Sequence, residues 1–372
     1  MAGAIVHEWI AASGGSEKVL DAMAQAFPDS DIFTLWSDAP DGFPTHHVYE
    51  SWLSRTTLRY HKALALPFLP VTWRRLTPRR TYDWVLVSSH LFAHHARFVG
   101  AAGALPKFVY VHTPARYIWT PELDSRGSGP LASVASSYFR RLDRKRAREP
   151  HRIAANSEYV RQRILNTWQR DATVIHPPVD VDRIREISDW CHKLSPMESD
   201  VMASVGTGYL LGASRFVRYK RLDLVIRTGQ ELDIPVVIAG RGPEEARLRE
   251  IAGTGSVPVT FVNAPSDALL YALYQSAGAF VFPPVEDFGI MPVEAMASGC
   301  PVVSLGEGGA KESVRDGVSG VIARDDTVES IAEAAEEALR LRRSSIPETV
   351  ARFSYARFGQ ELNEWLSEGT AS

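Results

Sequence analysis

Cysteine is scarce in this chain of 372 residues, since only Cys191 and Cys300 occur and neither has metal-type spacing around it. Such usage excludes a disulfide scaffold and fits a reducing compartment. The chain also lacks any run of about 18 uncharged apolar residues, so we expect no membrane-spanning helix. Its first residues, MAGAIVHEWI, lack the basic segment and apolar stretch of a secretion signal. We therefore expect a soluble, cytoplasmic protein.

An excess of positive charge is absent as well. The formal net charge is −3, whereas a dedicated nucleic-acid binder normally carries a net basic surface, so we expect no nucleic-acid partner. The composition, with 45% apolar and 23% charged residues, is that of a globular protein. Because single cores rarely grow beyond about 250–300 residues, the length favours two domains.

Short apolar runs alternate with helical stretches along the chain, most clearly from residue 205 onward. The expected strands of the second half are 208–213, 235–239, 258–262, 279–282, 301–304 and 319–322, and the expected helices are 222–232, 243–251, 266–276, 291–298, 310–315 and 327–342. The first half shows expected strands at 3–6, 31–35, 83–88, 107–112, 152–156 and 173–176. Strands that alternate with helices are typical of a parallel sheet covered on both faces, so the sequence predicts an α/β fold with two doubly wound domains.

The connector between the two domains is predicted at HPPVDVDR, residues 176–183, whose two prolines favour an extended backbone. We expect an N-terminal Rossmann-like domain over 1–177 and a C-terminal one over 178–353. The last segment, 354–372, is expected to form a helix that packs back toward the N-terminal domain. Ligands of such sheets bind beyond the carboxyl ends of the strands, so we expect the domains to face a cleft lined by strand-end loops.

Two cations follow the strand expected at 208–213. Arg215 supplies a planar fork of donors and Lys220 a mobile point charge, a combination that suits a diphosphate. The alternative is that each is an ordinary surface cation, which is the commoner state of a single basic residue. Their position directly beyond a strand end favours phosphate binding.

The first half offers Gly14-Gly15 before a helix expected at 16–26, and His112 at the end of a strand. The glycine pair would let backbone N–H groups approach an anion at the helix start, although glycine before a helix is more often simple turn chemistry. His112 is either a structural histidine or a donor to a hydroxyl or a developing charge. The stretch GRGPEE at 240–245 lacks the third glycine of the dinucleotide fingerprint and gives no evidence of NAD binding.

Two carboxylates stand eight residues apart in VEDFGIMPVEAMASG, residues 285–299. Pro292 suits the first turn of a helix, so Glu294 is expected in that turn, where a negative charge offsets the helix dipole. Capping does not account for Glu286, which precedes a bend at Gly289. The strand end, the acid, the glycine bend and the helix start together predict a pocket with an anion-binding end and a hydroxyl-accepting end, which suits a sugar.

These residues carry a resemblance to a known family. EDFGIMPVE at 286–294, followed by AMASGCPVVS and by GGAKESVRDGVSG at 308–320, resembles the E-x7-E signature of retaining glycosyltransferases of the GT-B fold in glycosyltransferase family four. Further segments are similar to that family in the expected order: HEWIAASGGSEKVL, YVHTPARYIW, ANSEYVRQRI, VIHPPVDVDR and SRFVRYKRLDLVI. The resemblance covers nearly the whole chain, and YVHTPARYIW is most similar to bacterial mannosyltransferases of polysaccharide or glycolipid assembly.

The resemblance implies a role for each matching position. It implies that Glu286 binds hydroxyls of the donor sugar, that Glu294 holds the ribose of the nucleotide, and that Arg215 and Lys220 neutralise the diphosphate. His112 would lie near the donor sugar. The remaining donor contacts, to the phosphates, the base or the sugar, are implied at Gly14, Gly15, Gly240, Val262, Phe288, Gly289, Ile290 and Met291.

The resemblance further implies an enzyme without metal or cofactor. It would move a hexose with retention from a nucleotide sugar, with mannose from GDP-mannose favoured, to a glycolipid, polysaccharide-precursor or other glycosidic acceptor. The N-terminal domain would bind the acceptor and the C-terminal domain the nucleotide sugar. Two alternatives remain open: an inverting or epimerase-type enzyme that uses His112 as base, and a non-catalytic GT-B protein that holds a nucleotide sugar.

The stretch 51–80 mixes Trp, Leu and Phe with seven basic residues and no acid. Basic amphipathic segments bind anionic membrane surfaces, so we expect a peripheral contact with the inner face of the cell membrane. A solvated helix that covers the core of the front domain explains the same composition. A second basic run, RRLDRKRARE at 140–149, is expected to be a solvated helix face.

Overall fold

The computed structural model describes residues 2–12, 14–119 and 130–370. The chain divides into two compact units. Unit 1 comprises Met1–Pro178 together with Tyr355–Ser372, and unit 2 comprises Val179–Ser354. The boundaries expected from the sequence, 177/178 and 353/354, differ from these by one residue each.

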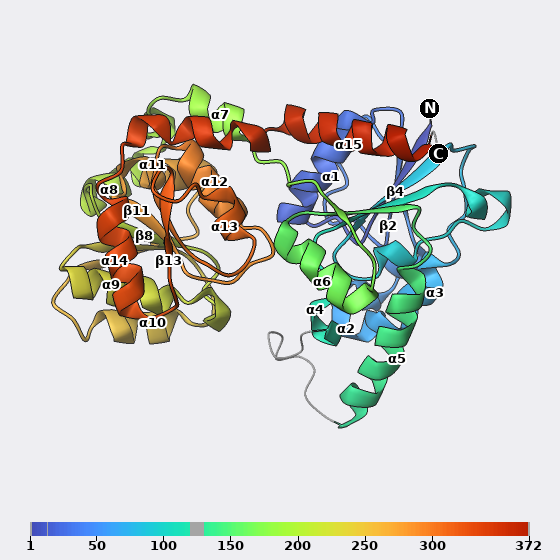
Figure 1. The fold of residues 1–372 in the computed structure, drawn as a ribbon, viewed down its shortest axis with the longest axis horizontal. Coiled ribbons are helices and arrows are strands. Elements are labelled where there is room, and N and C mark those ends of the chain that lie inside the picture. The colour runs from blue at the N-terminus through green and yellow to red at the C-terminus, as the bar shows by residue number, and fades with distance from the viewer. Residues whose placement is uncertain (1, 13, 120–129, 371–372) are drawn as a thin grey trace. The chain divides into compact units, whose positions relative to one another are not determined.

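Unit 1 is built on a parallel sheet of seven strands in the order β3-β2-β1-β4-β5-β6-β7. Figure 1 labels two of these strands, β2 and β4. The strands are β1 Gly3–His7, β2 Asp31–Thr34, β3 Val48–Glu50, β4 Trp84–Ser89, β5 Lys107–Val111, β6 Arg152–Ala155 and β7 Thr173–Val174. From β1 the order runs outward to β2 and β3, and from β4 it runs outward the other way. The pair β1–β4 is therefore the topological switch point, where sheets of this type bind ligands.

Helices cover both faces of this sheet. They are α1 Gly15–Ala26, α2 Lys62–Ala65, α3 Leu69–Trp73, α4 Arg116–Trp119, α5 Pro130–Arg146, α6 Glu158–Trp168 and α15 Tyr355–Thr370. On one face, α1 and α15 pack over Ile5 and Phe108, and α15 contributes apolar residues at helical spacing, Phe358, Leu362 and Trp365. The last segment of the chain thus belongs to the core of unit 1.

Unit 2 repeats the architecture with a parallel sheet of six strands in the order β10-β9-β8-β11-β12-β13. The strands are β8 Leu210–Ala213, β9 Val236–Gly240, β10 Val259–Asn263, β11 Ala279–Phe282, β12 Val302–Leu305 and β13 Gly320–Ala323. The helices are α7 Val181–Glu186, α8 Pro196–Val205, α9 Leu222–Leu232, α10 Glu245–Ala252, α11 Asp267–Ser276, α12 Ile290–Ala297, α13 Ala310–Ser313 and α14 Val328–Ala338. The switch point of this sheet is the pair β8–β11.

The prediction of two doubly wound α/β units is confirmed. Every strand expected from the sequence is present, and α9 has the bounds expected for it, 222–232. The edge strand β3, Val48–Glu50, was not expected, because three residues on the rim of a sheet produce no readable alternation.

Candidate functional site

The loops that leave the switch-point strands of unit 2 meet through one ion pair. Lys220 follows β8 and Glu286 follows β11, and Lys220 Nζ donates a hydrogen bond to Glu286 Oε1. The Lys220 side chain is 10% exposed to solvent, and the Glu286 side chain is 20% exposed. Two oppositely charged groups that the sequence predicted for a single pocket are therefore in direct contact at the predicted edge of the sheet.

The loop after β8 is held by the neighbouring loop after β9. Gly240 has φ +137°, and a Cβ there would lie 1.9 Å from the Ser214 carbonyl oxygen. The Phe216 backbone N–H donates to the Arg241 carbonyl at 2.9 Å. Arg215, at the exposed top of this loop, donates from Nη2 to the Tyr219 hydroxyl at 3.1 Å. Gly240, expected near the base, is thus required sterically to support the segment that carries the two cations.

The loop that carries Glu286 rests on a second pair of glycines. A Cβ on Gly308 would lie 2.9 Å from the Glu286 carbonyl oxygen, and one on Gly309 would lie 2.1 Å from the Asp287 carbonyl oxygen. The Gly309 N–H also donates to the Glu286 carbonyl at 2.8 Å. Neither glycine was predicted as a site residue, although the phrase GEGGAKE after a strand was the available signal.

Helix α12 begins directly after this loop, and its start corrects one expectation. Gly289 is the N-cap with φ +94°, a conformation that favours glycine, and Ile290 is the first helical residue. Glu294 is therefore the fifth residue, and no acid lies in the first turn, so the prediction that Glu294 offsets the dipole from the first turn is wrong. Glu294 is buried at 5% exposure, and its charge helps to raise the pKa of Tyr271, for which burial is the larger cause.

The other residues expected to contact the donor lie on the same rim of unit 2. Phe288 is buried and packs edge-on against Phe353 with ring centroids 5.5 Å apart. Ile290 and Met291 are half-buried at the start of α12. Val262 lies near the end of β10, paired in register with Ala239 of β9. Their placement is established, whereas their roles stay predictions.

Unit 1 places a row of polar side chains at its own switch point. His7 is the last residue of β1, Ser88 lies near the end of β4, and His112 follows β5. The Ser88 hydroxyl lies 2.9 Å from His7 Nδ1 and 2.8 Å from His112 Nε2. Burial lowers the pKa of both rings to about 3, so both are neutral at physiological pH. His112, expected near the donor sugar, is therefore tied into the sheet through Ser88.

Glu8 holds the neighbouring loop and was not predicted to have a role. Its carboxylate is fully buried and accepts hydrogen bonds from the backbone N–H groups of His90 and Ala93. Burial raises the pKa of Glu8 to about 7, against the opposing effect of these N–H groups. His90, fixed in this way, lies edge-on to Trp9 at 4.8 Å and to His112 at 6.3 Å between ring centroids.

The predicted anion site at Gly14-Gly15 already faces a carboxylate. Gly14 is the N-cap of α1 and Gly15 its first residue, both exposed. A Cβ on Gly14 would lie 2.2 Å from Glu17 Oε2, and this carboxylate accepts from Ala11 N at 3.2 Å and from Ser16 Oγ at 2.8 Å. A phosphate could bind at this helix start only after the Glu17 side chain turned away.

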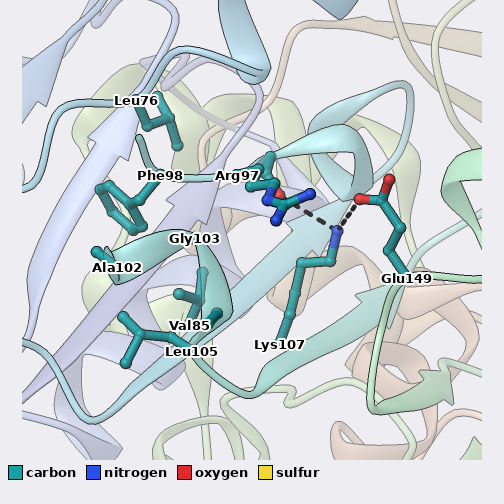
Figure 2. A pocket seen from close by; sticks show the side chains of 11 residues that line it. Leu76, Val85, Arg97, Phe98, Ala102, Gly103, Leu105, Lys107 and Glu149 are labelled. Carbon is teal, nitrogen blue, oxygen red and sulfur yellow. Dashed lines mark hydrogen bonds and ion pairs between the residues drawn. The ribbon is translucent and has the colours of Figure 1, made fainter. Parts of the chain in front are cut away.

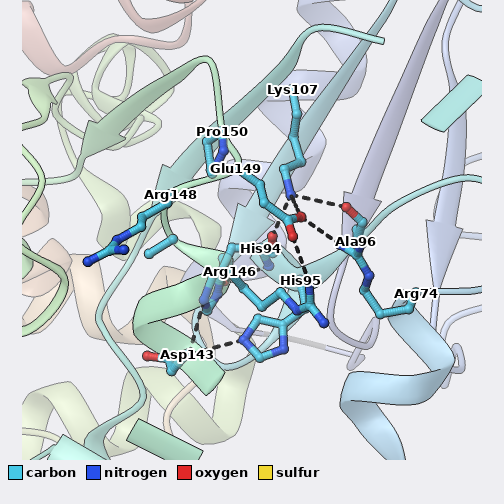
Figure 3. A network of polar contacts seen from close by, with 12 residues as sticks. Arg74, His94, His95, Ala96, Lys107, Asp143, Arg146, Arg148, Glu149 and Pro150 are labelled. Carbon is cyan, nitrogen blue, oxygen red and sulfur yellow. Dashed lines mark hydrogen bonds and ion pairs between the residues drawn. The ribbon is translucent and has the colours of Figure 1, made fainter. Parts of the chain in front are cut away.

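A second buried polar cluster in unit 1 is centred on Asp143 (Figure 3). Asp143 Oδ1 lies 3.0 Å from His94 Nε2 and 3.2 Å from His95 Nε2, and Oδ2 accepts from the indoles of Trp119 and Trp168, both at 2.7 Å. The imidazoles hold the Asp143 pKa well below its usual range, although burial alone would raise it. The two histidines and the aspartate have a spacing compatible with a metal, but the N–H groups of His95, Trp119 and Trp168 already donate three hydrogen bonds to the carboxylate. The expectation that 140–149 is simply a solvated helix face is therefore wrong at Asp143, which is fully buried.

A cavity of about 280 Å³ opens at the amino ends of strands β4 and β5, opposite the end that carries Ser88 and His112 (Figure 2). Val85 and Lys107, at the starts of β4 and β5, line it together with Phe98 and Glu149. Lys107 Nζ contacts the His94 carbonyl at 2.9 Å and Glu149 Oε2 at 3.4 Å, and burial lowers its pKa to about 8. Because the cavity lies at the amino ends of the strands, we place the functional site by the switch points instead.

The stretch 51–80 exposes apolar side chains on one side and buries them on the other. It forms short turns, Trp52–Arg55, Thr57–Tyr60 and Leu66–Phe68, besides α2 and α3. We call its exposed apolar residues the 52–71 patch; they are Trp52 (52% exposed), Tyr60 (73%), Leu64 (64%), Phe68 (45%) and Val71 (55%). Leu53, Leu69 and Trp73 pack into the core of unit 1. Among residues 2–12, 14–119 and 130–370, no helix combines the length and apolar character that crossing a bilayer requires.

Two family models match the chain, one for each half. Residues 13–183 match the model described as Glycosyltransferase Family 4, and residues 203–357 match the model described as Glycosyl transferases group 1. The D-inositol 3-phosphate glycosyltransferase of Mycobacterium leprae (strain Br4923) is 28% identical over 228 residues, which are 57% of this chain and 51% of that protein. The chain thus spans about half the length of the curated relatives it matches.

Solved structures share the fold over the whole chain. HepE of Anabaena, solved in complex with UDP-glucose, aligns with a TM-score of 0.69 and 18% identity over 98% of this chain and 99% of its own. Sucrose-phosphate synthase from Thermosynechococcus elongatus aligns with a TM-score of 0.72 and 17% identity over 100% and 99% of the two chains. Residues 13–183 thus carry a Glycosyltransferase Family 4 domain, residues 203–357 carry a Glycosyl transferases group 1 domain, and the chain has the GT-B fold.

Proposed function

We propose that this protein transfers a hexose from a nucleoside diphosphate sugar to a glycolipid or other glycosidic acceptor, with retention of the anomeric configuration. The observation that carries the proposal is the contact between Lys220 and Glu286 at the switch point of unit 2. A buried cation and a part-exposed carboxylate at this edge suit a ligand that is anionic at one end and rich in hydroxyls at the other.

The diphosphate would be bound by positive groups from two loops. Lys220 has N–H groups beyond the one it donates to Glu286, and Arg215 stands exposed on the same loop. Helix α12 starts behind Gly289, where its first backbone N–H groups favour an anion. Preorganised groups of this kind stabilise the charge that develops on the leaving diphosphate, which is usually the largest contribution to catalysis.

The sugar and the ribose would be bound by the two acids. Glu286 keeps its second oxygen for a sugar hydroxyl while Lys220 occupies the first. Glu294, buried one turn into α12, would accept hydrogen bonds from the ribose. Of the eight positions from Glu286 to Glu294, three lead to the N-cap Gly289 and five lie in α12.

We further propose front-face attack rather than a covalent intermediate. The bond between the anomeric carbon and the phosphate oxygen breaks as the acceptor oxygen bonds to the same face, and the departing phosphate oxygen takes the acceptor's proton. In this scheme Glu286 binds hydroxyls, the role that the resemblance implies for it, and is not the nucleophile. No metal or other cofactor has a role in the scheme.

The donor proposed first is GDP-mannose, on the resemblance of YVHTPARYIW to mannosyltransferases. The solved HepE complexes contain UDP-glucose or UDP, so a uridine donor is the direct competitor. Thermal-shift measurements with GDP-mannose, UDP-glucose, UDP-GlcNAc and a dTDP-hexose separate them. A shift with GDP-mannose alone supports the mannose proposal, a shift with another donor replaces it, and no shift with any of them contradicts the function.

The alternative of an inverting enzyme with His112 as base is disfavoured by two observations. Ser88 engages His112 Nε2, and burial lowers the pKa of the ring to about 3, which makes it a weak base. NMR of the product's anomeric proton tests the point directly, since retention gives an α-linked product from an α-linked donor. The non-catalytic alternative predicts donor binding without any release of nucleoside diphosphate.

The acceptor would be reached from an anionic membrane surface through the 52–71 patch. Five large apolar side chains are exposed there, and Arg55 and Arg75 are exposed in the same stretch of chain, 51–80. Trp52 is held by a hydrogen bond from its indole to Thr72 at 3.0 Å, so the patch is an ordered surface. Apolar side chains beside cations are the composition of segments that bind the membrane interface.

A further inference from the structure

Ser88 is a single hydroxyl placed between two imidazole rings. His7 and Ser88 are partners in the register of β1 and β4, and both are fully buried. The hydroxyl lies 2.9 Å from His7 Nδ1 and 2.8 Å from His112 Nε2, and these are its two side-chain partners among the described residues. The three groups therefore form one short chain of hydrogen bonds that ends at His112.

The chemistry of this chain allows few arrangements. A neutral imidazole has one N–H donor and one bare nitrogen acceptor, and both rings are neutral because burial lowers the pKa of each to about 3. A serine hydroxyl has one proton, so it can donate to one ring only. Both hydrogen bonds are satisfied when the hydroxyl accepts from one ring and donates to the other.

This condition couples the two tautomers. If His7 donates from Nδ1, then Ser88 donates to His112 Nε2, and the proton of His112 sits on Nδ1. If His112 donates from Nε2, then Ser88 donates to His7 Nδ1, and the proton of His7 sits on Nε2. The two rings thus have the same tautomer in either arrangement. Unlike tautomers leave one group unsatisfied. Either both imidazoles present a lone pair to the single hydroxyl proton of Ser88, or both present an N–H group and the buried hydroxyl proton has no acceptor from either ring.

We infer that Ser88 is a positioning residue, which couples the tautomer of His112 to that of the buried His7, so that Nδ1, the nitrogen not engaged by Ser88, meets the substrate with a donor or acceptor character that His7 sets. This inference rests on the proposed function, in which His112 lies near the donor sugar. A ring that alternated between tautomers would spend part of its time with a lone pair, or an N–H, opposed to the wrong atom of the ligand.

The neighbouring serine supplies a matched control. Ser89 is also buried on β4, and its hydroxyl lies 3.3 Å from Nδ1 of His94, in the cluster around Asp143. Ser88→Ala and Ser89→Ala each remove one buried hydroxyl that is hydrogen-bonded to histidine, but only the first removes a link between two imidazole rings, those of His7 and His112. Loss of a general packing or folding contribution would affect both variants alike.

The test is long-range 1H–15N NMR of the histidine rings in the full-length protein, which reports the tautomer directly. We expect His7 and His112 to share one tautomer in the unmodified protein and in Ser89→Ala, and His112 to average between tautomers in Ser88→Ala. Unlike tautomers in the unmodified protein, or an unchanged His112 in Ser88→Ala, would overturn the inference. The spectrum of the unmodified protein decides the matter even if Ser88→Ala does not fold.

Kinetics separate this inference from the proposed function. Once a donor whose sugar the protein transfers has been identified, kcat can be compared between variants. We expect Ser88→Ala to lower kcat on the order of tenfold, which corresponds to the loss of one hydrogen bond, and to leave the Kd for the nucleoside diphosphate unchanged. Like tautomers in a protein without transferase activity would refute the function and leave the coupling intact. Sugar transfer by a protein whose two histidines have unlike tautomers would support the function and refute the coupling.

Discussion

Lys220 Nζ donates a hydrogen bond to Glu286 Oε1, although the two residues are 66 positions apart in the chain. They meet because β8 and β11 are neighbours at the point where the strand order of unit 2 reverses. The pair balances a buried ammonium with a carboxylate and holds both side chains in place before any ligand arrives. A preformed site of this kind reduces the cost of ordering side chains when the ligand binds.

Replacing Glu286 with Gln is expected to reduce kcat by about 100-fold or more, because hydroxyl contacts formed by a carboxylate are charge-assisted and strengthen in the transition state. The overall fold should persist, since the Glu286 side chain is partly exposed. Glu307→Gln, on the exposed loop after β12, is the matched control and should retain activity. Turnover is measured as nucleoside diphosphate release. Near-normal turnover by Glu286→Gln would remove this residue from the mechanism.

Gly309→Ala is expected to disturb the Glu286 loop. The new Cβ would lie 2.1 Å from the Asp287 carbonyl oxygen, so the loop must shift, at a cost of about 1–3 kcal/mol in the free energy of unfolding. Donor affinity should fall with it. Gly306→Ala lies on the same loop, where the nearest atom to the new Cβ is 3.7 Å away, and it should leave both quantities unchanged. Thermal unfolding and donor titration measure the two effects, and equal behaviour of the two variants would contradict the packing argument.

The 52–71 patch is expected to bind anionic vesicles at low salt. Leu64→Asp and Phe68→Asp should each weaken sedimentation with such vesicles by about tenfold, because an inserted apolar side chain contributes about 1.5–3 kcal/mol and a carboxylate is repelled. Met197→Asp, at an exposed position of unit 2, is the control. Failure of the unmodified protein to sediment would exclude the membrane contact.

Acidification is expected to destabilise the protein between pH 6.5 and pH 5. Burial lowers the pKa of His7 and of His95 to about 3, so below about pH 6.5 the unfolded chain takes up protons that the folded chain does not. The loss is about 1.4 kcal/mol per pH unit for each histidine. Glu8 has the opposite effect on stability, because burial raises its pKa to about 7 and the folded chain then binds a proton before the unfolded chain does. Between pH 7 and pH 4.5 this gain offsets the loss of stability from about one histidine.

The thermal unfolding midpoint as a function of pH measures this balance. It should fall from pH 6.5 to pH 5 in the unmodified protein and fall less steeply in His95→Gln. His61→Gln, at an exposed position, should follow the unmodified protein. A midpoint that stayed level or rose on acidification would show that the buried histidines are not held neutral.

The fold could be read from the sequence because its signals are local. Each strand is a short apolar run, and each helix that follows has its own periodicity, so both units were predicted with their strand-end loops. Arg215, Lys220, Glu286 and His112 are predicted as site residues because each lies in a loop that follows a strand, and their roles stay predictions. The position of these four residues beyond strand ends was therefore predictable from the sequence.

The features that were missed depend on contacts between distant segments. Gly309 is required by the backbone of Asp287, and Ser88 acquires its partners only when β1, β4 and β5 lie side by side. Pro292, as a first-turn residue, predicts a helix start at 291, one residue later than the observed start at Ile290, because Gly289 in a left-handed conformation caps α12. In 51–80, the prolines at 67 and 70 accompany several short turns in place of one long helix.

Calorimetric titration with nucleoside diphosphates and the matching diphosphate hexoses tests the central claim most directly. The account predicts that one hexose donor binds the unmodified protein, and that Glu286→Gln weakens the donor by at least tenfold while the diphosphate alone binds as before, because Lys220 and Arg215 remain. Absence of binding by every donor and diphosphate would contradict the account, as would equal affinities of the unmodified protein and Glu286→Gln for the donor.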